Sequence, residues 1–163
     1  MGRKRKTIFV PVLLAHILSG CTFPYHTQKH GSTEVSVPSS NMESISTHTY
    51  SEISHLKIFW SEIFKQKEKD YFVYFYSETC SHCRSIKNHI IEYALDEDNH
   101  IYFVSSSPEI TIDEEKAKNN NVDKLTDLAI RGYPSLIKLS EKIVTLNVAG
   151  VSPILEALKI REE

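Results

Sequence analysis

Cys80 and Cys83 are the residues of this sequence best suited to chemistry, because they stand where a run of strand-forming residues ends and a helical pattern begins. A helix N-terminus presents unpaired N–H groups and the positive end of the helix dipole, and both stabilise an anion. A thiol placed there loses its proton more readily, and the thiolate is the nucleophile of disulfide exchange. The spacing puts the second sulfur one turn into the helix, so Cys83 could attack a mixed disulfide formed by Cys80.

Cysteines at this spacing have two other common uses. A C-x-x-C pair is half of a zinc site, but this chain has no second cysteine pair and no ligand pair at finger-like spacing among His82, His89 and His100. An inert structural disulfide is the other alternative. We expect neither a metal nor a cofactor, because in disulfide exchange the cysteine pair is itself the redox-active group.

The third cysteine belongs to an N-terminal export pattern. A basic start is followed by an apolar stretch at 8–17, which is shorter than the roughly 20 residues that a membrane-spanning helix needs. Leu18, Ser19, Gly20 and Cys21 come next and resemble the lipobox of bacterial lipoproteins, in which cleavage before the cysteine leaves its thiol to be joined to diacylglycerol. An anchor helix that is kept in the mature protein is the alternative.

The pattern predicts three parts of the chain. Residues 1–20 are expected to be a lipoprotein signal peptide. Residues 21–50 hold the lipidated Cys21 and a stretch rich in Ser, Thr, His, Gly and Pro, without apolar periodicity, which is typical of a flexible tether. Residues 51–163 form the folded domain, which would be extracytoplasmic and lipid-anchored to the bacterial cell membrane.

The sequence around Cys80 and Cys83 predicts buried strands alternating with helices. The run at 71–76 suits a central strand covered on both faces. Apolar residues recur at helical spacing from 81 to 94. Further strands are expected at 101–104, 135–139 and 143–148, the last two joined by a tight turn at 140–142.

Three more segments are expected to be helical. An amphipathic helix follows the tether, since its apolar residues lie on one face of a 3.6-residue period: Ile53, Leu56, Trp60, Ile63 and Phe64. Residues 122–130 predict a short helix, and the polar residues 113–121 a loop or a short surface helix. Ser152 is expected to cap the last helix, with Pro153 at its first position. This order of elements predicts an α/β sandwich.

Residues 130–136, Ile-Arg-Gly-Tyr-Pro-Ser-Leu, resemble the stretch around the cis-proline of the thioredoxin family. The turn at 147–150 is similar to that family's glycine-bearing turn, and the resemblance extends over about 51–160. It implies a thioredoxin-like three-layer sandwich with a central mixed four-stranded sheet flanked by helices. It also implies that Cys80 and Cys83 are catalytic, that the bond before Pro134 is cis, and that Tyr133 and Pro134 shape a substrate groove.

The sequence departs from thioredoxins at several positions near the cysteines. Thr79 replaces the tryptophan before the first cysteine, and Ser81 and His82 replace Gly-Pro between the cysteines. Tyr74 replaces a buried acidic residue that helps to deprotonate the resolving thiol, which leaves the proton acceptor for Cys83 open. Glu78 is the nearest acidic residue in the sequence.

His82 bears on the direction of electron flow. Oxidases of the DsbA type also have a histidine directly before the second cysteine, and a partly charged imidazole there favours the thiolate and makes the disulfide more oxidising. Those oxidases carry a large helical insertion, for which the interval between Cys83 and Pro134 is too short. A solvent-facing His82 without influence is the alternative.

The sequence therefore predicts an extracytoplasmic, monomeric thiol–disulfide oxidoreductase that acts on protein thiols and disulfides. Outside the signal peptide acidic residues outnumber basic ones, so the charge gives no reason to expect nucleic-acid binding. The alternative is a non-catalytic thioredoxin-like lipoprotein that binds a partner protein or a metal ion.

Overall fold

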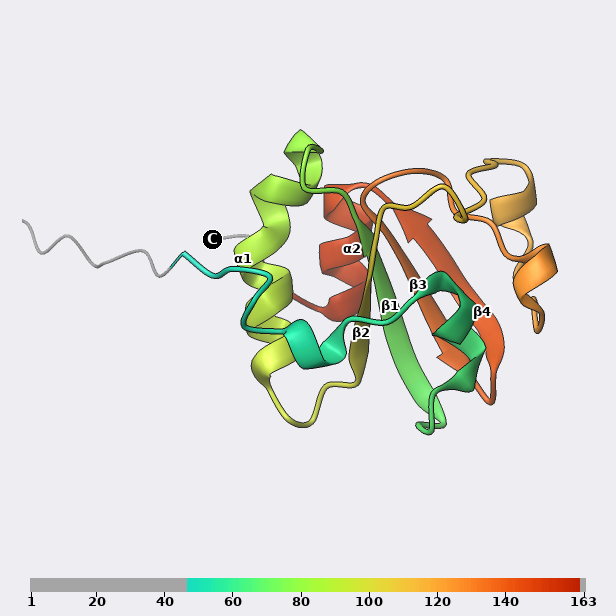
Figure 1. Ribbon diagram of the computed structural model, residues 1–163, viewed down its shortest axis with the longest axis horizontal. Coiled ribbons are helices and arrows are strands. Elements are labelled where there is room, and N and C mark those ends of the chain that lie inside the picture. Colours follow the sequence, from blue (N-terminus) through green and yellow to red (C-terminus); the bar gives the residue numbers. More distant parts are fainter. Residues whose placement is uncertain (1–46, 162–163) are drawn as a thin grey trace, which may run out of the picture. The chain divides into compact units, whose positions relative to one another are not determined.

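The computed structural model describes residues 47–161, whose centre is a mixed four-stranded sheet (Figure 1). The strands lie in the order β2-β1-β3-β4, with β2 parallel to β1 and the other neighbours antiparallel. Their bounds confirm the four expected strands: β1 Asp70–Tyr76, β2 Ile101–Ser105, β3 Ser135–Ser140 and β4 Ile143–Ala149. Two α-helices, α1 (Ser81–Leu95) and α2 (Val151–Leu158), complete the regular elements.

The central strand β1 divides its side chains between two hydrophobic cores. Tyr74 and Tyr76 face the layer formed by α1 and α2 and pack in one cluster with Cys83 and Ile90. Tyr71, Val73 and Phe75 face the opposite side of the sheet and belong to the second cluster. Because successive strand residues point to opposite faces, a continuous apolar run requires cover on both sides. The three-layer arrangement expected from the sequence is confirmed.

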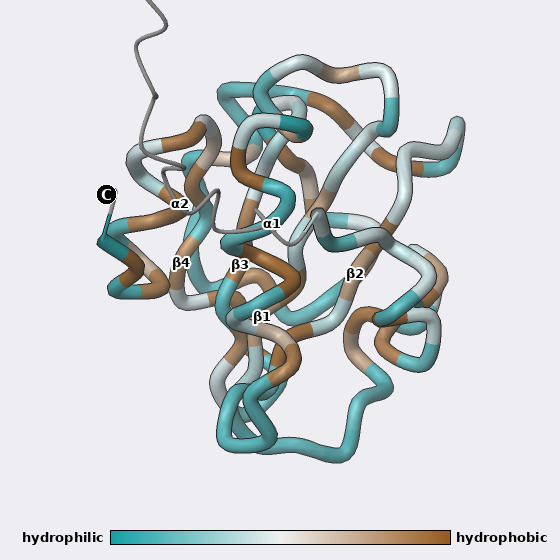
Figure 2. Tube along the Cα trace, turned by 90° about the vertical axis from the view of Figure 1, so that its left-hand side faces the viewer, coloured by the Kyte–Doolittle hydropathy of each residue, from teal (hydrophilic) through white to brown (hydrophobic). Residues whose placement is uncertain are grey.

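The layer opposite the α-helices consists of loops and short 3-10 helices. Figure 1 shows α1 and α2 together on one side of the sheet. Figure 2 shows hydrophobic stretches in the regular elements and in several of the loops, with hydrophilic residues between them. None of the helices within residues 47–161 combines the length and the apolar character needed to cross a membrane.

The predicted amphipathic helix after residue 51 is wrong. The segment instead forms two 3-10 helices, η1 (Ser54–Leu56) and η2 (Trp60–Lys65), separated by extended backbone. Between them Lys57 pairs with Phe103 of β2, and the Ile58 N–H donates to the Phe103 carbonyl at 2.9 Å. The segment thus passes along the edge of the sheet, and its apolar residues are divided between the two cores instead of lining one helix face.

The helix predicted at 122–130 is also wrong, since only η4 (Leu125–Asp127) is helical there. The ends of this segment form isolated bridges: Val122 pairs with Val144 of β4, and Ile130 pairs with Ile112 in the loop after β2. These backbone hydrogen bonds compete with a helix and hold the chain extended. The preceding polar stretch is a loop that contains η3 (Lys116–Lys118), as the sequence allowed.

Turns at both ends of β4 shape the C-terminal part. Glu141 and Lys142 adopt φ values of 49° and 63° and close the β3–β4 hairpin, the geometry of a type I′ turn. Gly150, with φ 93°, precedes α2, which begins at Val151. The expectation that Ser152 caps this helix is therefore wrong, because Ser152 lies inside the first turn. The buried residues of α2 are nevertheless those expected from the sequence: Ile154, Leu155 and Leu158.

Candidate active site

Cys80 is the N-cap residue of α1, and its sulfur accepts a hydrogen bond from the Cys83 N–H at 3.4 Å. β1 runs into a short turn that ends at this residue, so the strand fixes where the helix begins. Both cysteines are in the thiol form. Cys80 is partly exposed, whereas Cys83, one turn into the helix, is 1 % exposed. The structure thus presents one sulfur to solvent and shields the other.

The loop that contains Pro134 lies against Cys80. The start of β3 is paired with the end of β1, Ser135 opposite Phe75, so the residues before Ser135 reach the turn that carries the cysteines. The Cys80 thiol donates to the carbonyl of Tyr133 at 3.4 Å. The Tyr133–Pro134 bond is cis, which confirms the expectation from the sequence.

The glycine-bearing turn meets the same loop. The Gly150 N–H donates to the Pro134 carbonyl at 3.0 Å, and the Ser135 hydroxyl donates to the Gly132 carbonyl at 2.7 Å. At φ 93° Gly150 occupies a backbone region that residues with a Cβ rarely adopt. The cysteine pair, the proline loop and the glycine turn, which are far apart in the sequence, are therefore neighbours in space.

The pKa of Cys80 lies below that of an ordinary thiol. Partial burial opposes ionisation, but the thiol and N–H of Cys83, the N–H of His82 and the positive charge of Arg84 together outweigh it. The two N–H groups are the unpaired donors of a helix N-terminus. A lowered pKa is the property that an attacking thiol needs at neutral pH.

The pKa of Cys83 moves the other way, well above the ordinary value. Burial is the main cause, and the neighbouring Cys80 adds to it, whereas a backbone group of Ser77 and the Tyr74 hydroxyl oppose it only in part. A buried thiol without a positive neighbour stays protonated at neutral pH. A lowered pKa at Cys80 and a raised pKa at Cys83 are the directions that the sequence-based roles of attacking and resolving thiol predict.

His82 is exposed, and its influence on the Cys80 pKa comes through its backbone N–H. Arg84, which the sequence reasoning did not single out, is the side-chain charge that lowers this pKa. Its guanidinium donates to the carbonyls of Thr79 at 2.9 Å and Glu78 at 3.2 Å, and so holds the turn that carries Cys80. The sequence feature that could have identified Arg84 is its position one helical turn after the first cysteine.

We expect Arg84→Gln to raise the pKa of Cys80 by less than about one unit, because an exposed charge is screened by solvent. If the imidazole of His82 also favours the thiolate, His82→Ser raises the same pKa, although the backbone N–H is kept. The pH dependence of Cys80 alkylation by iodoacetamide, followed by peptide mass spectrometry, measures both. An unchanged pKa in His82→Ser would leave His82 with a backbone role alone, and an unchanged pKa in Arg84→Gln would contradict the assignment of Arg84.

Glu78 and Tyr74 differ in their relation to the resolving cysteine. The Glu78 side chain is exposed, and within residues 47–161 no hydrogen bond joins its carboxylate to either thiol. Tyr74 is fully buried in the cluster that contains Cys83. The position of the family's buried acidic residue thus holds a neutral phenol.

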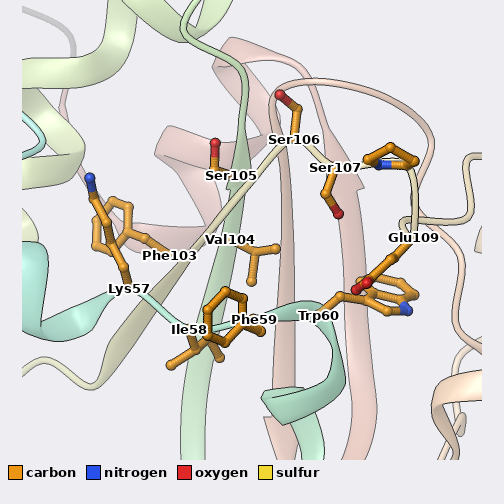
Figure 3. Close-up of a pocket in the computed structure, with 11 residues that line it drawn as sticks. Lys57, Ile58, Phe59, Trp60, Phe103, Val104, Ser105, Ser106, Ser107 and Glu109 are labelled. Atoms are coloured by element: carbon orange, nitrogen blue, oxygen red, sulfur yellow. The ribbon is translucent and has the colours of Figure 1, made fainter.

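No group of three or more metal-binding side chains occurs among the described residues, so His82, His89 and His100 do not form a metal site with the cysteines. A cavity of about 540 Å³ lies elsewhere, between 57–60 and the end of β2 with its following loop (Figure 3). It contains neither cysteine. Cys21 lies outside the described residues.

A dithiol at a helix N-terminus, facing a cis-proline loop in an α/β sandwich, defines a thioredoxin fold. The sequence model of the thioredoxin family, described as "Thioredoxin", matches residues 52–155, and the chain belongs to this family. A search of curated protein sequences finds no match.

Solved structures with similar backbones include thioredoxins of low sequence identity. Thioredoxin f2 of Chlamydomonas reinhardtii is 17 % identical, with 63 % of this chain and 91 % of that chain covered and a TM-score of 0.46. The short form of spinach chloroplast thioredoxin f is 19 % identical, with 63 % and 88 % covered and a TM-score of 0.45. Thioredoxin from Aeropyrum pernix is 20 % identical, with 63 % and 80 % covered and a TM-score of 0.43.

Proposed function

We propose that this chain is a thiol–disulfide oxidoreductase that exchanges disulfides with protein substrates through Cys80 and Cys83. The observation that carries the proposal is the asymmetry of the two thiols. Cys80 is partly exposed with a lowered pKa, and Cys83 is buried with a raised one. An attacking thiol needs access to the substrate and a thiolate at neutral pH, which Cys80 combines, and a resolving thiol needs to reach the sulfur of the first, which the neighbouring Cys83 can do.

The reaction proceeds in two exchanges. The Cys80 thiolate attacks one sulfur of a substrate disulfide, so that a Cys80–substrate bond forms while the substrate S–S bond breaks and its second sulfur leaves as a thiolate that takes up a proton. Cys83 then loses its proton and attacks the Cys80 sulfur. The Cys80–Cys83 bond forms, the second substrate thiol is released, and the substrate has gained the two electrons that the cysteine pair has lost. The reverse sequence oxidises a substrate dithiol.

Tyr133 and Pro134 are proposed to form one wall of the substrate groove. Their support is the contact between the Cys80 thiol and the Tyr133 carbonyl, which places this loop next to the reacting sulfur. A half-buried Tyr133 side chain offers an apolar surface with a polar end to an extended polypeptide.

Reduction of insulin by dithiothreitol tests the proposal. The purified chain lacking residues 1–21 should accelerate the precipitation of reduced insulin over the rate with dithiothreitol alone. A chain that folds but adds nothing to that rate would support the other class, a thioredoxin-like module that binds a partner protein without catalysis.

The lowered Cys80 pKa has a consequence for direction. A stabilised thiolate favours the reduced form of the pair and makes its disulfide more oxidising than one between ordinary thiols, and a charged His82 would add to this effect. The reduction potential of the Cys80–Cys83 couple, measured against glutathione, separates an oxidase or isomerase role from a reductase role.

We also propose that the mature chain begins at a diacylated Cys21 and is held outside the cytoplasm at the cell membrane. The support is the order of basic, apolar and Leu-Ser-Gly-Cys residues in 1–21. Cys21→Ala should abolish signal cleavage and lipid attachment, while the control Cys83→Ala should be processed normally. Mass spectrometry of the N-terminal peptide from membrane fractions measures both cleavage and lipid attachment. An intact, unmodified N-terminus in the unsubstituted chain would refute lipidation.

A further inference from the structure

Two polar side chains other than those of tyrosine and cysteine are buried in the part of the chain that the structure describes. They belong to Ser135, which is 0 % exposed at the start of β3, and Asn147, which is 6 % exposed on β4. Both donate a hydrogen bond to the segment that precedes β3. The Ser135 hydroxyl donates to the Gly132 carbonyl at 2.7 Å, and the Asn147 Nδ2 donates to the Ala129 carbonyl at 2.9 Å.

The segment that both side chains contact, residues 129–134, is the proline loop. Backbone N–H groups from other parts of the domain hold two more of its carbonyls, those of Ile130 and Pro134, at 3.0 Å each. The carbonyl of Tyr133 accepts from the Cys80 thiol. An irregular segment keeps one shape where its buried backbone groups are paired. The hydrogen bonds around Tyr133 therefore fix where its carbonyl meets the Cys80 sulfur.

Asn147 reaches the loop because of the face of the sheet to which it points. Its neighbour Val148 packs in the cluster on the α-helix side, and successive strand residues point to opposite faces, so Asn147 points to the side covered by loops. Ala129 is 1 % exposed there, and its carbonyl needs a partner within the protein. The Asn147 Oδ1 has no partner within residues 47–161, so this amide makes its one side-chain hydrogen bond to the proline loop.

We propose that Asn147 and Ser135 are positioning residues for disulfide exchange. They hold the proline loop where the Tyr133 carbonyl meets the attacking sulfur of Cys80 and where the loop can bind a polypeptide substrate. The inference rests on the exchange reaction proposed above. It adds two residues that act through the loop and not on the reacting sulfurs.

The alternative is that the two hydrogen bonds only satisfy buried carbonyls, which is a contribution to stability. A purely stabilising bond changes the fraction of molecules that is folded, but not how a folded molecule binds its substrate. A positioning bond changes the binding of a polypeptide that lies along the loop. A small disulfide needs only the exposed sulfur and should react as before.

The test compares a protein substrate with a small disulfide. Ser135→Ala removes one buried oxygen, and Asn147→Leu replaces the amide by an apolar side chain of similar size. Both are made in the full-length chain carrying Cys21→Ser, in detergent, whose remaining thiols are Cys80 and Cys83. Reduction of insulin by dithiothreitol over a range of insulin concentrations gives KM and kcat. The first release of thionitrobenzoate from dithiobis(nitrobenzoate), followed by stopped-flow absorbance, gives the rate of attack by Cys80 on a small disulfide.

We expect each variant to raise the KM for insulin about three- to tenfold, the effect of one lost hydrogen bond. The kcat and the first thionitrobenzoate release should stay within about twofold, because an interaction made equally with the substrate and the transition state affects KM alone. Circular dichroism at the assay temperature confirms that the variants are folded. Ser135→Ala tests the proposal by itself if Asn147→Leu does not fold.

Tyr71→Phe is the matched control, because it also removes a buried hydrogen bond from a side chain to a carbonyl. The Tyr71 hydroxyl donates to the Ile63 carbonyl at 2.6 Å, near the end of β1 that lies away from Cys80. This variant should lose thermal stability as the other two do. Its KM, its kcat and its thionitrobenzoate release should equal those of the unsubstituted chain.

An unchanged KM in either folded variant, or an equal rise in Tyr71→Phe, would overturn the positioning role and leave the exchange function intact. The same conclusion would follow if the thionitrobenzoate release slowed as much as insulin reduction, because the substitutions would then have disturbed the cysteine pair itself. Failure of the proposed function is a separate result. In that case the unsubstituted chain adds nothing to the reduction of insulin by dithiothreitol alone, and the positioning role fails with it.

Discussion

Cys80→Ala is expected to abolish insulin reduction, a loss on the order of a hundredfold or more relative to the unsubstituted chain. The attacking sulfur has no substitute, since Cys83 is 1 % exposed and burial holds its pKa above the ordinary range. The same variant should show no rapid alkylation near neutral pH.

Cys83→Ala should also lose turnover, but for a different reason. Cys80 keeps its place as the N-cap of α1, so the first exchange proceeds and a mixed disulfide with the substrate accumulates. Non-reducing gel electrophoresis after mixing with insulin detects this adduct, which should be missing in Cys80→Ala.

Ser81→Ala serves as the control for both variants, because Ser81 lies between the cysteines, is exposed and carries no thiol. It should retain activity within about twofold, because the hydrogen bonds of the Cys80 sulfur are made with Tyr133 and Cys83 and an exposed substitution changes stability little. The assignment of roles would be reversed if Cys83 were alkylated faster than Cys80, or if Cys80→Ala trapped the adduct instead.

Elements with a strong local pattern could be predicted from the sequence. β1 is a continuous run of strand formers, and α1 buries the four apolar positions expected of it: Ile86, Ile90, Ile91 and Ala94. The segment after residue 51 could not be predicted in the same way. Its spacing suits a helix, but pairing of Lys57 and Ile58 with β2 provides backbone partners that no periodicity reveals.

The candidate site shows the same division between local and long-range information. The place of Cys80 at a helix start follows from adjacent residues, whereas the contact with the Tyr133 carbonyl depends on the β1–β3 pairing and was not predicted. The family resemblance implied only that Tyr133 and Pro134 shape a groove. Tyr50 was assigned to the tether because polar residues precede it. It nevertheless stacks on Tyr76 of the domain core, a contact set by tertiary packing.

Ile90→Ala should destabilise the domain strongly. Ile90 is fully buried where α1 packs on the sheet. Truncating such a side chain costs about 2–5 kcal/mol, because apolar contacts are lost and a cavity remains. Alanine has the higher helix propensity, but this stabilises the variant by less than about 0.7 kcal/mol, so Ile90→Ala still lowers the free energy of unfolding. Since domains of this size have only about 5–15 kcal/mol of stability, the Tm should fall by ten degrees or more.

Leu95→Ala is the matched control on the same helix, because Leu95 is 46 % exposed at the end of α1. Its free energy of unfolding should change by less than about 1 kcal/mol. Urea unfolding monitored by circular dichroism compares the two variants in the chain lacking residues 1–21. Below its unfolding transition Ile90→Ala should still alkylate at Cys80 at the normal rate, because the N-cap geometry depends on the first turn of α1 rather than on its middle. Equal losses in both variants would contradict the packing of α1, and a slowed alkylation in folded Ile90→Ala would show that this core residue also positions the cysteine pair.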